Sequence, residues 1–316
     1  MAAPKVYIDG QAGTTGLRIR EWLEGRTDID LISVAEARRK NVDARRECIS
    51  EADLCVLCLP DDAAREAVSW IGNQSTRVID ASTAHRVSDG WAYGLPELTG
   101  EQRDVIREAQ FVANPGCYPS AFVLLVRPLI DAGLLGASTP FAIHALSGYS
   151  GGGRPMIERW EADSPLTHLP FEAPYALDKV HKHVPELRTY GGCDVEPQFV
   201  PAVGPFRCGM RVEVPIHASL VDADVDEAAI RRCWEGRYAG EPFVRVGAAV
   251  DTVGEMTFDP RTCNDTNAIE LHVKGHPSGH IMLIALLDNL GKGASGAAIQ
   301  NMNLMLGLSE GQGLPG

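Results

Sequence analysis

Lys5-Val6-Tyr7-Ile8-Asp9 is followed directly by Gly10-Gln11-Ala12-Gly13-Thr14-Thr15-Gly16. The first five residues have the apolar composition of a short strand, and residues 16–23 have the spacing of an amphipathic helix. The glycines between them follow G-x-x-G-x-x-G, not the G-x-G-x-x-G of dinucleotide-binding turns, so the spacing alone is weak evidence. The position between strand and helix strengthens it, because backbone amides there can approach a pyrophosphate.

We therefore predict that this turn binds a dinucleotide, with a plain glycine turn as the alternative. The predicted contacts are Gly10, Ala12, Gly13, Thr14, Thr15 and Gly16.

Strand and helix patterns continue to alternate through the first third of the chain. Apolar runs at residues 30–34, 54–59 and 77–80 read as further strands, with a helix at about 61–71. This alternation predicts a doubly wound parallel sheet of the Rossmann type. From about residue 141 the runs lengthen and alternate, as at 210–214 and 269–273, which predicts an α+β substrate domain with a large mixed sheet. The fold class is thus α/β.

The change from alternating strands and helices to longer alternating runs suggests the domain limits. We expect residues 1–116 to form an NADP-binding domain that is completed by the C-terminal segment 288–316, where a helix at 293–308 can pack back on it. Residues 117–287 would form the catalytic, substrate-binding and oligomerisation domain. A large sheet face often pairs with a second copy, so a homodimer or homotetramer is expected. The tail, residues 309–316, is expected to be mobile.

Composition narrows the classes of partner. The 316 residues are 45% hydrophobic and 22% charged, with a net charge of −13, which argues against nucleic acid. No run of about 18 apolar residues occurs and no signal-peptide core precedes the first strand, so we expect a cytoplasmic protein without a membrane partner. Cys55 and Cys58 form a C-x-x-C string inside a predicted buried strand. Residues three apart on a strand face opposite sides, which argues against a metal or dithiol role.

Cofactor choice depends on the end of the second strand. An acidic residue there would bind a ribose hydroxyl, whereas arginines would hold a 2′-phosphate. Glu36 leaves NAD open, but Ser33, Arg38 and Arg39 favour NADP. The alternative for this basic run is a solvated surface patch.

Cys117 lies between a short strand pattern at 111–113 and a helical pattern that begins near Pro119. Proline is favoured in the first helical turn, so the N–H groups and positive dipole end of that helix would stabilise a thiolate. An inert buried cysteine is the alternative. The glycine turn upstream and the histidines downstream favour a nucleophile, because together they supply a hydride carrier and a base.

The histidines are His181 and His183, followed by Glu186. They can form a general base oriented by the carboxylate, or bind a metal. The metal interpretation is weaker, because no H-E-x-x-H string and no third ligand at local spacing occur, and we predict no metal. One histidine of the pair is also expected to cap a helix that starts near Pro185.

Three further stretches are rich in groups that hold anions. Arg86 follows the fourth strand at the carboxyl end, where doubly wound sheets bind ligands. Residues 147–154 are too glycine-rich for regular structure, and residues 288–296 can return beside the cofactor. Each can instead be an ordinary loop, and Arg86 a surface ion pair. Predicted cofactor contacts here are Ser82, Asn289 and Lys292; predicted substrate contacts are Arg86, Ser147, Gly148, Tyr149 and Arg154.

Five motifs carry a resemblance that spans nearly the whole chain. They are 93–98 (YGLPEL), 114–120 (NPGCYPS), 147–154 (SGYSGGGR), 181–187 (HKHVPEL) and 288–300 (DNLGKGASGAAIQ). Together they resemble the N-acetyl-gamma-glutamyl-phosphate reductases of arginine biosynthesis, and the opening turn and short chain resemble their type 2 branch. The resemblance implies kinship with aspartate-semialdehyde and glyceraldehyde-phosphate dehydrogenases, whose cysteine motifs differ.

The resemblance implies that the Cys117 thiolate attacks an acyl phosphate, phosphate leaves, and NADPH reduces the thioester to a semialdehyde. It implies proton transfer by the pair His181/His183 with Glu186; His181 is favoured, but the sequence does not separate the two. Arg86 lies on a segment that reads STAHR where the family has an SADFR-like string. That departure weakens its assignment to the substrate phosphate or carboxylate.

Three alternatives stay open. One is a related acyl-phosphate reductase such as aspartate-semialdehyde dehydrogenase. A second is a non-catalytic NADP-binding sensor, which would need only the glycine turn. The third is a metal-dependent hydrolase that uses His181, His183 and His280.

Overall fold

The computed structural model describes residues 2–71, 75–162, 171–248 and 257–316. The chain divides into two compact units, which are described separately. Unit 1 consists of Met1–Pro115 and Ala294–Leu314, and unit 2 consists of Gly116–Gly293 and Pro315–Gly316.

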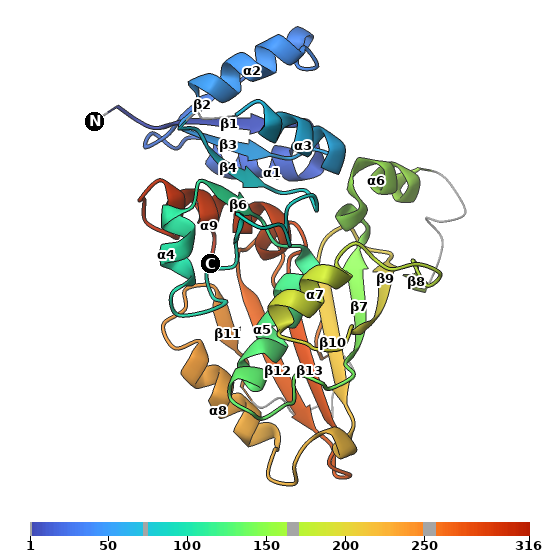
Figure 1. The fold of residues 1–316 in the computed structure, drawn as a ribbon. Helices are drawn as coiled ribbons and strands as arrows, with labels where there is room; N and C mark the ends of the chain where they lie inside the picture. The colour runs from blue at the N-terminus through green and yellow to red at the C-terminus, as the bar shows by residue number, and fades with distance from the viewer. Residues whose placement is uncertain (1, 72–74, 163–170, 249–256) are drawn as a thin grey trace. The chain divides into compact units, whose positions relative to one another are not determined.

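Unit 1 is built on a six-stranded sheet in the order β2-β1-β3-β4-β6-β5, and all its pairings are parallel (Figure 1). The central strands are continuous apolar runs that are buried on both faces, as parallel strands between two helical layers must be. The strands are β1 (Lys5–Asp9), β2 (Asp30–Ile32), β3 (Leu54–Leu57), β4 (Arg77–Asp80), β5 (Ala92–Tyr93) and β6 (Phe111–Ala113).

Helices cover both faces of this sheet. Helices α1 (Thr14–Leu23), α4 (Gln102–Glu108) and α9 (Gly296–Met305) pack in the cluster that contains Val6 and Ile8. On the opposite face, α2 (Val42–Glu51) and α3 (Asp61–Ser69) pack in the cluster that contains Tyr7. The doubly wound sheet is thus confirmed. Cys55 belongs to the second cluster and Cys58 contacts the first, so the two thiols lie on opposite faces, as predicted.

Unit 2 is built on a seven-stranded mixed sheet in the order β11-β12-β13-β10-β7-β9-β8 (Figure 1). Its central pairs β12·β13, β13·β10 and β10·β7 are antiparallel, whereas β7·β9 and β11·β12 are parallel. The strands are β7 (Ala142–Gly148), β8 (Ala173–Pro174), β9 (Gln198–Gly204), β10 (Met210–Ile216), β11 (Val244–Val246), β12 (Ile269–Gly275) and β13 (Ile281–Leu287).

Alternate residues of β7, β10 and β12 are buried, and the residues between them are largely half-exposed. This is the pattern of a sheet with one face covered by helices. Helix α5 (Cys117–Asp131) packs on β10 and β13 and contacts α7 (Val184–Gly191) and α8 (Glu227–Arg237). The remaining helix is α6 (Gly153–Glu161), which follows the 3-10 turn η2 (Tyr149–Gly152). The predicted mixed sheet is confirmed.

The C-terminal segment differs from the prediction in two ways. A π-helical turn, η5 (Gly291–Ser295), precedes α9, so the regular helix is shorter than the predicted run of 293–308. The prediction of a mobile tail is wrong, because the tail is hydrogen-bonded to unit 1: Glu310 pairs with Arg103, and the carbonyl of Gln312 accepts from Arg26 and Asn303. Arg26 and Arg103 come from distant parts of the sequence, which the local composition of the tail does not reveal.

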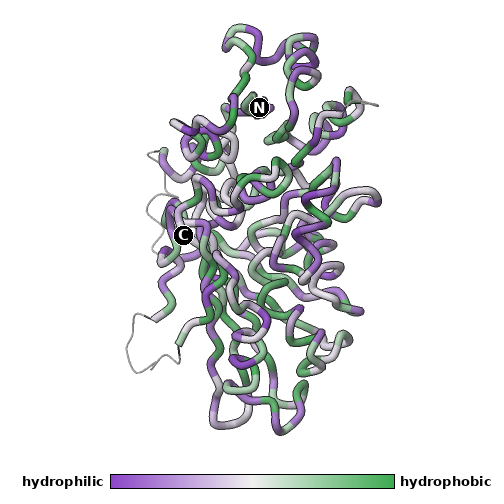
Figure 2. The backbone as a smooth tube through the Cα atoms, turned by 90° about the vertical axis from the view of Figure 1, so that its left-hand side faces the viewer, coloured by the Kyte–Doolittle hydropathy of each residue, from purple (hydrophilic) through white to green (hydrophobic). Residues whose placement is uncertain are grey.

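Hydrophobic and hydrophilic residues are interleaved along the backbone (Figure 2). Among the helices of the described residues, none has both the length and the apolar composition that crossing a membrane requires.

Candidate active site

At two positions of the glycine turn in unit 1, Gly10 and Gly16, any side chain would collide with the neighbouring backbone. Gly10 has φ +86°, and a Cβ there would lie 2.3 Å from the carbonyl oxygen of Cys58 at the end of β3. A Cβ on Gly16 would lie 2.7 Å from the carbonyl oxygen of Gly10. The turn is closed by the Gly13 N–H, which donates to the Gly10 carbonyl at 2.9 Å. The backbone is therefore held close to β3, and nothing projects from these positions toward an approaching ligand.

Helix α1 starts directly after this turn. Its N-cap is Gly13, no side chain caps it, and no acidic residue lies in its first turn. The first N–H groups of a helix have no intrahelical acceptor, so they and the positive dipole end suit an anion. Thr14, Thr15 and Gly16, predicted as cofactor contacts, form this first turn.

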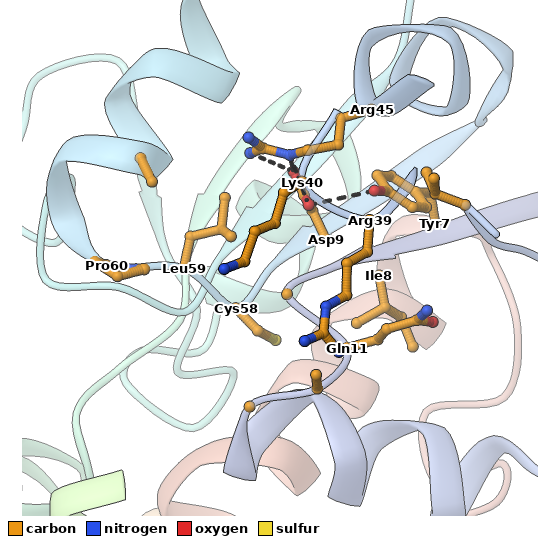
Figure 3. Close-up of a pocket in the computed structure, with 15 residues that line it drawn as sticks. Tyr7, Ile8, Asp9, Gln11, Arg39, Lys40, Arg45, Cys58, Leu59 and Pro60 are labelled. Atoms are coloured by element: carbon orange, nitrogen blue, oxygen red, sulfur yellow. Dashed lines mark hydrogen bonds and ion pairs between the residues drawn. The ribbon is translucent and has the colours of Figure 1, made fainter. Parts of the chain in front are cut away.

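A pocket of about 530 Å³ opens beside the turn (Figure 3). Gly10, Ala12, Gly13 and Arg39, all predicted cofactor contacts, line it. Ser33 and Arg38 are not among its lining residues. Arg38 ends an exposed 3-10 turn (Glu36–Arg38), and successive residues of such a turn point in different directions, so Arg39 can face the pocket while Arg38 does not. Lys40 and Arg45 line the pocket without having been predicted to.

The charges in this pocket are not equivalent. Arg45, on α2, donates through Nε and Nη2 to the buried carboxylate of Asp9 at 2.9–3.1 Å and lies 4.8 Å from the ring centroid of Trp70. Arg39 forms an exposed ion pair with Glu36. Within the described residues, no ion pair involves Lys40. The charge of Arg45 is thus compensated by a buried carboxylate, whereas the partner of Arg39 is solvent-exposed and can be replaced; the cations that an anionic ligand would meet are Lys40 and Arg39 (Figure 3).

The segment after β4, also in unit 1, is organised by a buried carboxylate. Asp80 accepts from the Ser82 N–H and hydroxyl, each at 2.8 Å, and its Oδ2 lies 2.6 Å from His85 Nδ1. His85 stacks on Trp91 with ring centroids 4.2 Å apart. Arg86 is buried and donates to the Ala81 carbonyl at 3.2 Å. Ser82 and Arg86 therefore hold their own loop in place.

In unit 2, Cys117 is the first residue of α5 and Gly116 is the N-cap. The predicted junction is confirmed, since the helix starts two residues before Pro119. The Gly116 N–H donates to the buried Glu186 carboxylate of α7 at 2.9 Å. On its other side, Cys117 is so close to Gly293 that a Cβ on that glycine would lie 2.7 Å from the Cys117 Cβ. The backbone and Cβ of Cys117 are thus held by close packing against Gly293 and by the hydrogen bond of the preceding residue.

A connected set of rings lies beside this cysteine. The Tyr118 and Tyr175 hydroxyls are 3.2 Å apart, and the Tyr175 hydroxyl is 3.5 Å from His181 Nε2. His181 Nδ1 accepts from the His183 N–H at 3.2 Å, so the neutral ring carries its proton on Nε2. His183 and Phe199 complete the set, with ring centroids 4.8 and 5.2 Å from that of His181.

Burial shifts the titration of these groups. Desolvation, together with the charges of Lys182 and Lys179, lowers the pKa of His181 to about 4, so the ring is neutral at pH 7. Desolvation and the charge of a Cys117 thiolate raise the pKa of Tyr175 to about 12, although the bond to Tyr118 opposes this. The thiolate has the same effect on Tyr118, whose pKa burial raises. The sulfur, the two phenols and the histidine thus share one electrostatic environment.

The structure brings Cys117, His181, His183 and Glu186 together within unit 2. His183 occupies the N-cap position of α7, as predicted for one of the pair, but its side chain forms no capping hydrogen bond. Glu186 binds the Gly116 N–H, which ties it to the cysteine loop. Tyr118 and Tyr175 were not predicted as members of the site. The position of Tyr118 next to the cysteine was a usable signal, whereas Tyr175 lies 57 residues away and gave none.

Family models match both halves of the chain. The semialdehyde dehydrogenase NAD binding domain matches residues 5–106, and the semialdehyde dehydrogenase dimerisation domain matches residues 117–289. N-acetyl-gamma-glutamyl-phosphate reductase 2 of Pseudomonas putida is 45% identical over 99% of this chain and 100% of its own length. The N-acetyl-gamma-glutamyl-phosphate reductase of Brucella anthropi is 48% identical over 96% of this chain and 99% of its own length.

The chain belongs to the N-acetyl-gamma-glutamyl-phosphate reductase family. It is an oxidoreductase with the nicotinamide-cofactor domain of the semialdehyde dehydrogenases. Aspartate semialdehyde dehydrogenase II of Vibrio cholerae, complexed with ASA, shares the fold: its TM-score is 0.73 at 16% identity, covering 97% of this chain and 99% of that one. The resemblance drawn from the five motifs is confirmed.

In this reductase-family chain, the glycine-rich segment 147–154 is ordered by its own contacts. A Cβ on Gly148 would lie 2.4 Å from the Arg207 carbonyl oxygen, and the Ser147 hydroxyl donates to the Gly148 carbonyl at 3.1 Å. Tyr149 stacks on Trp160 with centroids 5.8 Å apart. Arg154 is 74% exposed and pairs with Glu158 at 2.7 Å. Of these predicted substrate contacts, Ser147 is buried and acts on the pKa of Tyr118, the residue after the cysteine.

Asn289 and Lys292, predicted as cofactor contacts, lie in unit 2 and are held there. Asn289 accepts from the Gly209 N–H at 2.8 Å and donates to the Ser150 hydroxyl at 2.9 Å. Lys292 is fully buried, with its ammonium 5.8 Å from the centroid of the Phe243 ring. Both side chains order the segment that carries Gly293 to its contact with Cys117.

Proposed function

We propose that this chain reduces N-acetyl-gamma-glutamyl phosphate to N-acetyl-glutamate semialdehyde with NADPH, through a thioester on Cys117. The observation that carries the proposal is the position of Cys117 at the start of α5, beside a buried phenol, a half-buried phenol and a neutral histidine. The names of relatives at 45% and 48% identity support the substrate. Unit 1 would hold the cofactor and unit 2 would carry the chemistry.

The chemistry of the cysteine follows from its place on the helix. The N–H groups of the first turn of α5 and the helix dipole favour the thiolate over the thiol. The thiolate attacks the acyl carbon, the carbon–sulfur bond forms, and phosphate leaves with the carbon–oxygen bond electrons. The released phosphate takes up the one proton that the whole reaction consumes. A thioester is the reason for covalent catalysis here, because it is reduced more readily than a carboxylate.

Bound NADPH would supply a hydride to the thioester carbon. The charge that then develops on oxygen needs a hydrogen-bond donor, and a neutral His181 with its proton on Nε2 is one. Collapse of this intermediate breaks the carbon–sulfur bond, releases the semialdehyde and restores the thiolate. His181 then acts by donating a hydrogen bond at each tetrahedral stage, while Glu186 keeps the cysteine loop in place through Gly116.

Substituting the nucleophile tests the proposal. Cys117→Ser keeps the shape of the side chain but not an ionisable thiol, so reductase turnover is expected to be abolished while NADPH binding, followed by fluorescence titration, is nearly unchanged. Retained turnover would contradict the thioester. A panel of N-acetyl-glutamate semialdehyde and aspartate semialdehyde, oxidised in the presence of phosphate, tests the acyl group. Preference for aspartate semialdehyde would transfer the chain to the related reductase class.

For the cofactor, we propose that Lys40 and Arg39 hold the 2′-phosphate of NADPH. The glycine cradle and the pocket beside it fit a dinucleotide, and these two cations line that pocket while Arg38 does not. A hydrogen bond to a charged group contributes about 1.5–3 kcal/mol, so Lys40→Ala should lower the NADPH/NADH ratio of kcat/KM by roughly 10- to 100-fold. Arg38→Ala is the matched control and should leave the ratio unchanged. An equal effect of both substitutions, or of neither, would contradict the assignment.

The match of residues 117–289 to a dimerisation domain supports a further part of the proposal, that the chain assembles as a homodimer or homotetramer. Light scattering of the purified protein tests it, and a monomeric mass at micromolar concentration would contradict it.

A further inference from the structure

A second pocket, of about 830 Å³, lies in unit 2 at the end of the sheet remote from Cys117. It is lined by the start of β7, the end of β10 and the turn between β12 and β13. Cys117 contacts Gly293 near the opposite end of β13, beyond Leu287. Seven residues of strand at about 3.3 Å each separate the two ends by roughly 20 Å, so this pocket is distinct from the cysteine site.

Three histidines gather in this pocket. His217 follows β10, and His276 and His280 flank the β12–β13 turn. The ring centroids of His217 and His280 are 4.5 Å apart, and those of His276 and His280 are 6.0 Å apart. None of these residues has a part in the reaction described above.

Each imidazole is held through its Nδ1 by a backbone N–H. His217 Nδ1 accepts from the Ser219 N–H at 3.1 Å and lies 2.8 Å from the hydroxyl oxygen of the same serine. His276 Nδ1 accepts from the Ser278 N–H at 3.2 Å and lies 2.6 Å from the hydroxyl oxygen of Ser278. His280 Nδ1 accepts from the Ala218 N–H at 3.0 Å. An Nδ1 that accepts carries no proton, so each neutral ring carries its proton on Nε2. The cluster therefore presents hydrogen-bond donors.

This tautomer argues against a metal as the occupant. A metal bound at Nε2 needs that nitrogen's lone pair, which places the ring proton on Nδ1 and breaks all three backbone hydrogen bonds. Among the residues that the structure describes, no group of three or more His, Cys, Asp or Glu side chains has an arrangement that could hold a metal ion.

The remaining lining fits a ligand with one charged and one apolar end. Lys274 adds a positive charge, and no Asp or Glu is among the lining residues. Glu227 lies close by, but it accepts from the Gly275 N–H at 2.9 Å and pairs with Arg231 at 3.0 Å. The rest of the wall is apolar: Pro140, Ala142, Pro215, Ile216, Leu220, Pro277, Ile281 and Met282.

We propose that this pocket binds a small organic anion, with its carboxylate or phosphate on the histidine Nε2–H groups and Lys274 and its apolar body against the proline and aliphatic wall. Convergent donors in an otherwise apolar concavity are the usual composition of a small-molecule site. In a chain with a net charge of −13, a concavity that holds a lysine and three imidazole donors and is lined by no carboxylate selects for anions. The inference does not depend on the proposed reductase reaction.

Fluorine NMR of three probes tests the proposal: 4-fluorobenzoate, 4-fluorophenyl phosphate and neutral 4-fluorobenzyl alcohol, each titrated against the full-length protein. We expect saturable broadening for at least one anion and none for the alcohol, and the two anions distinguish a carboxylate site from a phosphate site. His217→Ala and Lys274→Met should each weaken the binding about tenfold or more. His144→Ala, a half-exposed histidine outside the pocket, should not.

Because an alanine variant can fail for structural reasons, His217→Gln is included; its side-chain amide keeps a donor and should retain part of the affinity. The proposal is overturned if no anion saturates, if the alcohol binds as well as the anions, or if the pocket variants bind like the wild type. It is also overturned if those variants leave anion binding intact and change the oligomeric mass in light scattering, since the pocket would then belong to an interface with a second copy.

Discussion

The cofactor pocket of unit 1 and the cysteine site of unit 2 are built from different materials. The pocket is made of backbone: Gly10 and Gly16 approach neighbouring carbonyls closely, and its cations, Arg39 and Lys40, are exposed. The cysteine site is made of buried and half-buried rings around His181, and desolvation shifts the pKa values of His181 and Tyr175. The pocket thus depends on space, and the cysteine site depends on the exclusion of water. Substitutions in the two regions should fail in different ways.

Loss of space in unit 1 should have the largest effect. Gly10→Ala must adopt φ +86° and place a Cβ 2.3 Å from the Cys58 carbonyl oxygen. Left-handed backbone and overpacking each cost about 1–3 kcal/mol, so we expect the free energy of unfolding to fall by roughly 3–5 kcal/mol, with loss of cofactor binding. Urea unfolding and NADPH titration measure both.

Gly25→Ala is the control for this effect, since Gly25 has φ +80° and nothing within 4 Å of the added Cβ. It should lose about 1–2 kcal/mol and keep its affinity for NADPH. Equal losses in the two variants would mean that close packing of the turn on β3 does not matter.

A glycine-to-alanine substitution at Gly293 in unit 2 should affect turnover more than NADPH binding. A Cβ on Gly293 would lie 2.7 Å from the Cys117 Cβ and 3.1 Å from the Asp288 carbonyl oxygen, so Gly293→Ala must displace the thiol. A misplacement of about 1 Å can cost about 100-fold in rate, and we expect kcat to fall by that factor while NADPH affinity changes little. Gly236→Ala, in α8 with open space around it, should be slightly stabilised and fully active. Wild-type kcat in Gly293→Ala would contradict a fixed thiol.

The pH dependence of stability should report the half-buried side chain of His181. The pKa of His181 falls from 6.5 to about 4 on folding, so the unfolded chain binds more protons between these values. This contribution to stability is present above about pH 6.5 and is lost as the pH falls toward 4. After allowance for solvent screening of the partly exposed ring, the loss should be about 1–2 kcal/mol.

Urea unfolding between pH 4.5 and 7.5 checks this. His181→Gln should flatten the pH dependence by that amount. If the pH dependence of His181→Gln equals that of the wild type, the His181 imidazole of the wild type is solvated and this account of its pKa is wrong.

The smallest effect is expected at Arg154. This side chain is 74% exposed and forms an i,i+4 pair with Glu158, which contributes about 0.3–0.5 kcal/mol to stability. Arg154→Ala should therefore change the free energy of unfolding by less than about 0.5 kcal/mol. The Michaelis constant for the acyl phosphate is the informative readout: a rise of about tenfold or more would support the predicted substrate contact, and an unchanged value would remove it.

The features that could be predicted from the sequence are those that a local residue pattern determines. The apolar runs at β1, β3 and β4 and the alternation of β10 and β12 fixed the two sheets, because burial on two faces or on one leaves a direct trace in composition. The start of α5 at Cys117 was also predictable, since Gly116 and Pro119 favour a helix start there. Ends of elements were less accurate, as the π turn before α9 shows.

Contacts between distant residues left no such trace. Arg45 reaches the pocket because α2 packs above the end of β1, and it meets Asp9 across 36 positions of sequence. Tyr175, which follows β8 on the edge of the sheet beside β9, meets Tyr118 across 57 positions of sequence. Arg38 and Lys40 are two residues apart and both basic, so the sequence does not show which of them faces the pocket. The backbone turn at Glu36–Arg38 decides it, and only Lys40 lines the pocket.

Thiol reactivity tests the central claim most directly. The protein contains eight cysteines, and burial raises the pKa of Cys58 and Cys263 to about 12 and that of Cys193 to about 11. Iodoacetamide at pH 7, followed by peptide mass mapping over time, should label Cys117 first, with loss of turnover in parallel and with protection by the acyl phosphate. Labelling that spares Cys117 while turnover is lost, or a trapped acyl adduct on another residue, would contradict the account.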